Sequence, residues 1–258
     1  MLFQSKSYLK FLLKSTKLHG VHSPFIYELV SQCFNDTKQK GWYSQFEKYR
    51  NSLINNSSSI TVEDFGAGSK SLKSNKRKIS EIAKNAGITS KRGELLGRFA
   101  TYLNANVILE IGTSLGIATS CLALGNPKAT ITTLEGCTAT AAIATDHFKK
   151  FKLNNINTVI GNFNETLAKT IDGNTYDLIY FDGNHQKEAT IAYFNQCLRH
   201  SHNESVFIFD DIYWSKEMKE AWKYIKEHPK VSLTIDTFHW GVVFFRQEQV
   251  KEHFVVRV

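Results

Sequence analysis

The chain has 258 residues, 42% hydrophobic and 22% charged, which is enough to bury a core in one large domain or in one domain with a cap. Its apolar runs fall far short of the ~18–20 residues that cross a bilayer, and its first residues lack the apolar core and cleavage site of a signal peptide. We therefore expect a globular protein that neither spans a membrane nor is secreted. The four cysteines are widely spaced without a C-x-x-C pair, which excludes the common zinc and thioredoxin-type motifs and favours reduced, buried thiols in a cytoplasmic protein.

Residues 1–100 carry the positive charge, with 17 Lys and Arg against 7 Asp and Glu, a net charge of +10, whereas the remainder has 15 against 17. We expect this basic part to be a helical cap or substrate region. In its first helix Tyr8, Leu9, Leu12 and Leu13 can share one apolar face with lysines opposite. The charge suits an anionic substrate, nucleic acid or a membrane surface, and equally a solvated basic face.

Two stretches within this region have patterns of their own. Val62–Ser69 has the pattern of a strand, an acid and a glycine turn, but no second strand ending in an acid follows it at a suitable spacing. We interpret it as a loop or lid on the substrate side. Lys70–Lys78 carries several cations and no apolar period, so we expect a mobile loop there.

From about residue 105 onward, short apolar strands alternate with helices, and the chain ends in a hairpin. Parallel strands need crossover connections, so five βα units predict a parallel sheet. We predict an α/β fold with a doubly wound, seven-stranded, Rossmann-like sheet, a terminal antiparallel hairpin and a helical N-terminal cap, divided into residues 1–100 and 101–258. Ligands of such sheets bind beyond the C-terminal ends of the strands. The expected strands are 107–111, 129–134, 157–160, 176–181, 205–209, 231–237 and 241–246, and the expected helices are 117–124, one ending near 150, 165–171, 188–200 and 216–228.

The first of these strands, Val107–Ile111, leads into a turn bracketed by Gly112 and Gly116, where glycine lets the backbone approach a ligand closely. The spacing is not G-x-G-x-x-G, which disfavours a dinucleotide pyrophosphate. Glu110, directly before the turn, would repel a phosphate and attract an ammonium group. Glu135 ends the next strand, where an acid can accept hydrogen bonds from both ribose hydroxyls. An amino-acid cation and an unphosphorylated ribose together describe S-adenosylmethionine; the alternative is a strand-turn-helix with incidental acids.

These features resemble the class I S-adenosylmethionine-dependent methyltransferases over residues 86–246, and the E-x-G-x-x-x-G turn is the most specific of them. The stretches AGITSKRGELLGRF, FDGNH and FDDIYW are similar to the O-methyltransferase branch. The resemblance implies that Gly112–Ser114 lines the methionine end of the cofactor, that Glu135 binds its ribose, that Asn162 contacts its adenine and that Thr89–Gly93 folds over it. The cofactor-binding residues expected in all are Glu110, Gly112, Thr113, Ser114, Gly116, Glu135, Asn162 and Asp182.

Three aspartates end two further strands: Asp182 the fourth, Asp210 and Asp211 the fifth. Side by side, their like charges are unfavourable unless neutralised, and a divalent cation with oxygen ligands such as Mg²⁺ would do so. In the metal-dependent O-methyltransferases that the sequence resembles, the matching positions bind such an ion, which holds two vicinal substrate oxygens. That family often has Asp-Asn where this chain has Asp210-Asp211. The alternative is that Asp182 and Asp210 cap helices or hydrogen-bond the cofactor.

His185 follows Asp182 by three residues, where relatives place a proton acceptor. Histidine exchanges protons near neutral pH, so it suits removal of a proton from an acidic hydroxyl. The alternative is a structural histidine that pairs with the Asp182 carboxylate. Tyr213 and Trp214 follow the other aspartates and form either a wall of the acceptor pocket or ordinary core.

The reaction we expect is O-methylation of a small hydroxylated molecule by S-adenosylmethionine, with His185 and Asp182 as catalytic residues and a divalent cation as a further aid. One alternative is an RNA methyltransferase that modifies a transfer-RNA uridine hydroxyl, suggested by the basic first third, although no RNA-reading module is recognisable. Another is a catalytically silent cofactor-binding protein, and a nicotinamide oxidoreductase is disfavoured by the glycine spacing. The amphipathic first helix leaves open whether it serves a homodimer or closes the active site.

Overall fold

The computed structural model of the chain describes residues 2–63 and 74–258. By packing, the chain forms two compact units: unit 1 contains residues 1–36 and 173–258, and unit 2 contains residues 37–172. The first 36 residues therefore belong with the C-terminal part of the chain. This grouping differs from the predicted boundary at residue 100.

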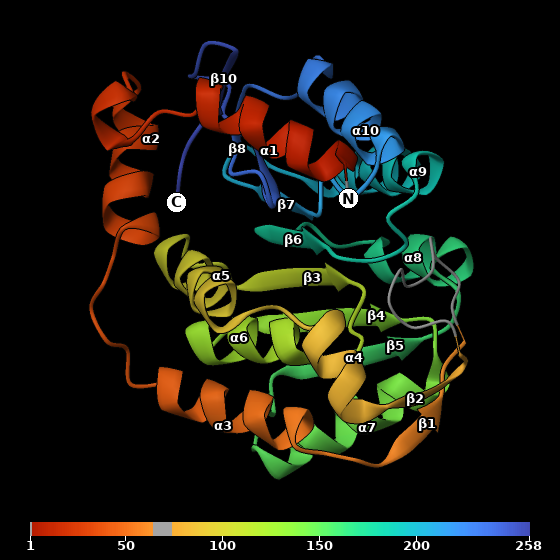
Figure 1. Cartoon of the computed structure of the whole chain (residues 1–258). Helices are drawn as coiled ribbons and strands as arrows, with labels where there is room; N and C mark the ends of the chain where they lie inside the picture. Colours follow the sequence, from red (N-terminus) through yellow and green to blue (C-terminus); the bar gives the residue numbers. More distant parts are fainter. Residues whose placement is uncertain (1, 64–73) are drawn as a thin grey trace. The chain divides into compact units, whose positions relative to one another are not determined.

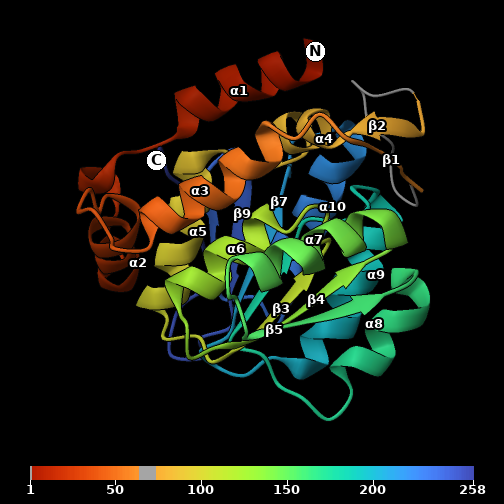
Figure 2. The same ribbon diagram turned by 90° about the horizontal axis from the view of Figure 1, so that it is seen from below.

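Unit 2 is built on three parallel strands that lie side by side in the order β3-β4-β5 (Figure 1). Apolar β3 is buried along most of its length, as expected of a parallel strand covered on both faces. Helix α3 packs along α6 and α4 (Figure 2). The elements of unit 2 are α3 (Tyr43–Ile54), β1 (Ser59–Thr61), β2 (Lys76–Lys78), α4 (Ile79–Asn85), α5 (Ser90–Tyr102), β3 (Val107–Ile111), α6 (Ile117–Gly125), β4 (Thr130–Glu135), α7 (Thr138–Lys150), β5 (Ile156–Ile160) and α8 (Phe163–Ile171).

Strands β1 and β2 form an antiparallel pair. The expected mobile loop is therefore wrong for its last three residues, because Lys76–Lys78 is strand β2. Backbone hydrogen bonds account for this strand, because they form between main-chain groups whatever the side chains are. The pairing continues on both sides of β1 and β2, with Val62 N donating to Asn75 O (2.8 Å) and Ile79 N donating to Ser58 O (2.9 Å). Most of the Val62–Ser69 turn and the start of the basic loop lie outside the described residues.

Unit 1 holds a mixed sheet in the order β6-β7-β9-β8-β10. Strands β6 and β7 are parallel, and β8 and β9 form the predicted antiparallel hairpin, with β9 also antiparallel to β7. The elements of unit 1 are α1 (Leu2–Lys14), η1 (Leu18–Gly20), α2 (Pro24–Leu29), η2 (Val30–Phe34), β6 (Leu178–Phe181), α9 (Lys187–Cys197), η3 (Leu198–His200), β7 (Val206–Asp210), α10 (Lys216–Glu227), β8 (Leu233–Asp236), β9 (Trp240–Phe244) and β10 (Glu252–Val255).

All seven predicted strands are present, with ends within two residues of those expected. Strand β10, which pairs in parallel with β8, was not predicted. Only Phe254 of its four residues is buried, so this short strand lacks the alternating pattern by which strands are recognised. The four cysteines are free and buried, as expected. Among the described helices, none is both long and apolar enough to cross a membrane.

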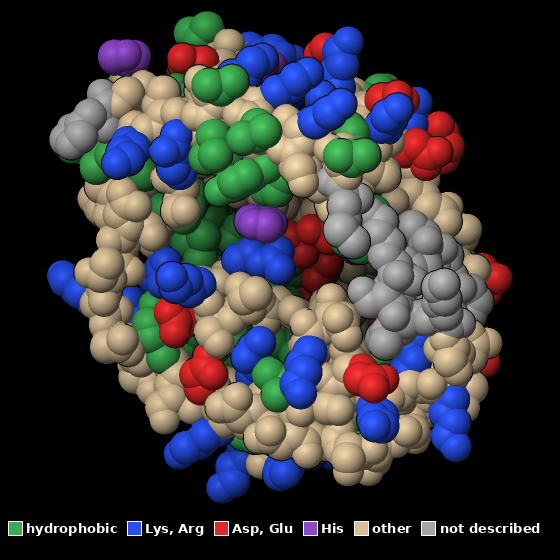
Figure 3. All heavy atoms as spheres, viewed as in Figure 1, with side chains coloured by type: hydrophobic (Ala, Val, Ile, Leu, Met, Phe, Trp, Pro, Cys, Tyr) green, Lys and Arg blue, Asp and Glu red, His purple; other side chains and the backbone are tan. Residues whose placement is uncertain are grey.

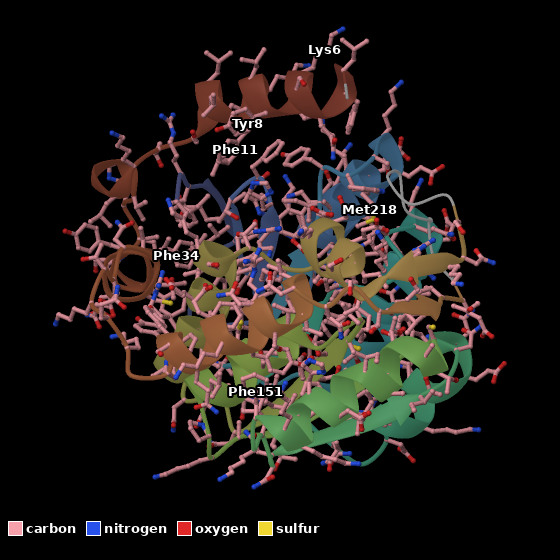
Figure 4. All side chains as sticks on the ribbon, turned by 60° about the horizontal axis from the view of Figure 1, so that its bottom comes forward. Lys6, Tyr8, Phe11, Phe34, Phe151 and Met218 are labelled. Carbon is pink, nitrogen blue, oxygen red and sulfur yellow. The ribbon has the colours of Figure 1, made fainter. Side chains whose placement is uncertain are left out.

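Helix α1 buries a different face from the one predicted. Leu9 and Leu13 are 61% and 87% exposed, whereas Phe11 is only 6% exposed. Figure 4 shows Tyr8 and Phe11 directed inward from α1, and their ring centroids lie 4.9 and 5.6 Å from that of Phe238. On the outer side, hydrophobic side chains lie among lysines (Figure 3). The helix has apolar residues on most sides, and the aromatic partner in unit 1 decides which side is buried.

Candidate cofactor site and the aspartate loops

The C-terminal ends of three strands meet at one edge of the unit 2 sheet. In the pairing register Ile111 of β3 lies beside Leu134 of β4, and Glu135 lies beside Ile160 of β5. The acids at the ends of β3 and β4 and the loop after β5 are therefore neighbours, as expected of a doubly wound sheet. The whole predicted cofactor signature lies within unit 2.

The turn after β3 needs glycine at both of its ends. Gly112 and Gly116 have φ values of 109° and 73°, and Ser114 between them has φ of 49°. A Cβ atom on Gly116 would lie 2.5 Å from the Phe148 ring. The amides of Gly112 and Thr113 both donate to the Leu134 carbonyl at 3.0 Å, which ties the turn to the end of β4. The backbone at this turn is thus tightly specified.

Glu110 is a fully buried acid whose two oxygens have different surroundings. Its Oε2 accepts hydrogen bonds from the hydroxyls of Thr119 and Thr133, the second at 2.6 Å. Its Oε1 is buried and has no hydrogen-bond partner among the described residues. Burial raises the pKa of Glu110 to about 7. A buried carboxylate with an unpaired oxygen fits a cationic ligand group, as predicted for the ammonium of S-adenosylmethionine.

The threonines around Glu110 were missed by sequence reasoning. Thr113 of the turn lies 2.6 Å, hydroxyl to hydroxyl, from Thr133, so the chain of hydrogen bonds runs from the turn through β4 to the acid. The available signal was the run of threonines in the strand that ends at Glu135, because hydroxyls that become buried need partners. These donors hold the carboxylate in place.

Glu135 is held against the same turn. Its Oε2 accepts from the Ser114 amide at 2.6 Å, and its Oε1 accepts from the Cys137 amide at 2.9 Å. Burial raises its pKa, and its charge contributes to the raised pKa of Glu110, so the two acids lie near each other. Thr140 and Gly136 also hydrogen-bond this carboxylate and lower its pKa, so the surrounding groups hold Glu135 in place, and its contact with ribose hydroxyls stays a prediction.

Two other predicted contacts have local structural roles. Asn162 is the N-cap of α8, and its Oδ1 accepts from the Asn164 amide at 3.0 Å. Thr89 is the N-cap of α5, where its hydroxyl accepts from the Arg92 amide at 3.5 Å. Helix capping accounts for both side chains. Their roles toward adenine and as a cover for the cofactor stay predictions.

Two of the aspartates in unit 1 lie level with each other. Phe181 of β6 pairs with Phe209 of β7, so Asp182 and Asp210 follow at matching positions of parallel strands. Asp211 then adopts a left-handed backbone with φ of 53°. Within residues 2–63 and 74–258, however, no three His, Cys, Asp or Glu side chains are grouped so that they could hold a metal ion. The predicted cation site at the three aspartates therefore stays a prediction.

His185 lies beside Asp182, with 3.7 Å between its Nε2 and the Asp182 Oδ1. This distance is that of an ion pair when the ring is protonated and is longer than a hydrogen bond. The ring centroid lies 6.3 Å from that of Trp214. Asn184 and His185 both have positive φ, 71° and 43°, so strained backbone occurs in this loop as it does at Asp211. Such strain is often found at functional sites. The contact matches the alternative of a histidine paired with Asp182.

Tyr213 packs within unit 1. Its hydroxyl donates to Asp236 Oδ2 at 2.6 Å, and its ring stacks on Phe238 with centroids 5.2 Å apart. Burial and the negative charge of Asp236 raise the pKa of Tyr213 far above its usual value, so it stays a donor. Of the two readings of Tyr213, these contacts support ordinary packing.

Comparison with known proteins finds a similarity to methyltransferases. A family model described as a methyltransferase domain matches residues 109–212, which include the glycine turn, Glu135 and the aspartates. Catechol O-methyltransferase of Mycobacterium tuberculosis is 28% identical over 127 residues, 48% of this chain and 56% of that protein. Residues 109–212 of this chain are thus similar to a methyltransferase domain. The alignment spans only about half the length of the curated relative it matches.

Solved methyltransferase structures have the same fold. The SAH-bound methyltransferase PaMTH1 of Podospora anserina is 15% identical, with a TM-score of 0.62 over 88% of this chain and 97% of that one. The O-methyltransferase of Bacillus cereus in complex with SAH is 19% identical, with a TM-score of 0.55 over 84% and 96%. At these identities the likeness concerns the fold, and it confirms the predicted methyltransferase sheet.

Proposed function

We propose that this methyltransferase transfers a methyl group from S-adenosylmethionine to a hydroxyl oxygen of a small molecule. The observation that carries the proposal is the buried, unpaired oxygen of Glu110 beside a glycine turn that Glu135 closes. One acid suits the ammonium group of the cofactor and the other its ribose. The similarity to a catechol O-methyltransferase supports a small hydroxylated acceptor.

S-adenosylmethionine, when bound, supplies a methyl group already activated on a sulfonium. The protein then has to orient donor and acceptor and help remove the hydroxyl proton. Glu110, with its hydroxyl donors, would hold the amino-acid end, and Glu135 would hold the ribose. His185 is the proposed proton acceptor, and Asp182 beside it would stabilise the protonated ring. As the acceptor oxygen takes the methyl group that the cofactor would supply in place of its bond to sulfur, the hydroxyl proton would pass to His185.

We route no step through a metal ion, because the described residues form no three-ligand group for one. Asp182, Asp210 and Asp211 remain the residues to which a divalent cation would bind if activity requires it. A methyl-transfer assay with added Mg²⁺ and with a chelator tests whether the reaction requires the ion. Equal rates of methyl transfer under the two conditions would exclude a role for it.

The cofactor proposal is tested by titration calorimetry with S-adenosylmethionine and S-adenosylhomocysteine. Glu135→Ala should lose most of the affinity because the ribose contact goes. Glu165→Ala, on the exposed side of α8, is the control and should bind as the wild type does. Wild-type affinity in Glu135→Ala would remove the basis of the proposed site.

The acceptor is tested by transfer of labelled methyl groups to catechols, other small phenols and enols, and transfer RNA. We expect product from the small hydroxylated acceptors. Labelling of RNA alone, with binding that weakens steeply as salt rises, would replace this proposal with the RNA alternative. Tight cofactor binding without any labelled product would favour the catalytically silent protein.

A further inference from the structure

The side chain of Tyr49, on helix α3, contacts the glycine turn that follows β3. Its side chain is fully buried, and its hydroxyl donates to the Leu115 carbonyl at 2.9 Å. A Cβ atom on Gly116 would lie 2.7 Å from this hydroxyl oxygen. The tyrosine therefore occupies the space that the glycine leaves open, and it binds the carbonyl of Leu115 near the end of the turn.

The ring of Tyr49 is fixed by aromatic neighbours at the end of α7. Its centroid lies 5.6 Å from that of His147, 6.2 Å from that of Phe148 and 5.1 Å from that of Phe151. Such contacts restrict the ring to one orientation. Burial, followed by the charge of Glu110, raises the pKa of Tyr49 well above its usual value. The hydroxyl is thus a permanent donor near the buried acid.

The next residue along α3 reaches a second segment. Arg50 Nε donates to the Ile88 carbonyl at 3.3 Å, directly before the Thr89 cap of α5. Two consecutive residues of one helix therefore hold the glycine turn and the start of the segment that the family resemblance places over the cofactor. Helix α3 comes from the first hundred residues, which were predicted to form a substrate-side cap.

We propose that Tyr49 is a positioning residue for the cofactor site: its hydrogen bond to Leu115 holds the turn in the conformation that binds the nucleoside. The ordering of the turn is a property of the free protein. The effect on ligand affinity rests on the proposed function. Helix α3 then belongs to the cofactor-binding part of the protein.

The test compares Tyr49→Phe with Tyr43→Phe. Tyr43 lies on the same helix, is also buried, and its hydroxyl accepts a hydrogen bond from Arg98 Nη1 at 2.8 Å. Each variant loses one hydroxyl and one hydrogen bond, but only Tyr49 contacts the turn. We measure amide hydrogen exchange of residues 112–117 in the free protein, the Kd of S-adenosylhomocysteine, and kcat and KM for S-adenosylmethionine.

In Tyr49→Phe we expect exchange in the turn to quicken by about three- to tenfold and the Kd and the cofactor KM to rise by a similar factor, with kcat at saturating cofactor within about twofold of the wild type. Tyr43→Phe should leave all of these near the wild-type values. A merely structural role would change both variants alike.

Equal exchange in the two variants would overturn the inference, whatever the binding results. Faster exchange in Tyr49→Phe with an unchanged Kd would overturn the link to the cofactor. If the wild type binds no nucleoside, the proposed function fails instead, and the exchange data alone then decide whether Tyr49 orders the turn.

Discussion

The buried carboxylate of Glu110 should make cofactor binding depend on pH. Burial raises its pKa to about 7 in the free protein, whereas the ligand's ammonium group requires the charged form. Below pH 7 a proton must leave before the ligand binds, so the apparent Kd grows by the factor 1 + 10^(pKa − pH). Between pH 7.5 and 6.0 this weakens binding by roughly eightfold. The ligand's α-amino group has a pKa of about 8 and is therefore mostly charged in this window.

Titration calorimetry from pH 5.5 to 7.5, in two buffers that differ in ionisation enthalpy, measures both the Kd and the protons released on binding. Glu110→Gln keeps an oxygen for the threonine hydroxyls but has no charge, so we expect weaker binding at pH 7.5 and no dependence on pH. Glu165→Gln, exposed on α8, should keep the wild-type profile. If the Kd of Glu110→Gln depended on pH as that of the wild type does, or if the wild-type Kd did not depend on pH, Glu110 would not be the group that binds the ammonium.

The same raised pKa predicts how the cofactor-free protein responds to pH. In the unfolded chain the carboxyl loses its proton near its ordinary pKa of 4.5, whereas in the folded protein it keeps it until about 7. The folded state therefore binds more protons in this window, and the free energy of unfolding falls as pH rises, by up to about 3 kcal/mol from this group. Urea unfolding at pH 5 and pH 8 should show this fall in the wild type and a smaller one in Glu110→Gln.

Three further changes test the packing and the loops. Gly116→Ala should lower the free energy of unfolding by more than about 2 kcal/mol in urea and abolish nucleoside binding, whereas Gly173→Ala, also left-handed but with open space around it, should cost only about 1 kcal/mol. Phe11→Ala should cost about 3 kcal/mol and Leu13→Ala less than about 0.5 kcal/mol, since only Phe11 is buried; equal losses would contradict the orientation of α1. Asp182→Asn should bind the nucleoside as before but lose most of its turnover in the labelled-methyl assay, and loss of affinity would move Asp182 into the cofactor site.

The strands and helices of the methyltransferase sheet could be predicted because their signals are local. A short apolar run such as Val107–Ile111 has few alternatives to a buried strand, and the glycines and acids at strand ends mark the turn that follows. Strand β10 and the pair β1-β2 carry no such pattern, because backbone pairing alone holds them. They could be recognised only with their partners in place.

The sequence by itself determined the order of strands and helices, the glycine turn, and the two acids, Glu110 and Glu135, at one edge of a parallel sheet. Tertiary structure alone decided which side of α1 is buried, which threonines surround Glu110, and that Tyr49 of a distant helix holds the turn. The physical reason is that the spacing of apolar residues along the chain indicates whether a segment is a helix or a strand and which of its faces is apolar. The partner of a side chain is set by packing between segments far apart in the sequence, as with Tyr49 and Leu115, whose sequence separation is 66.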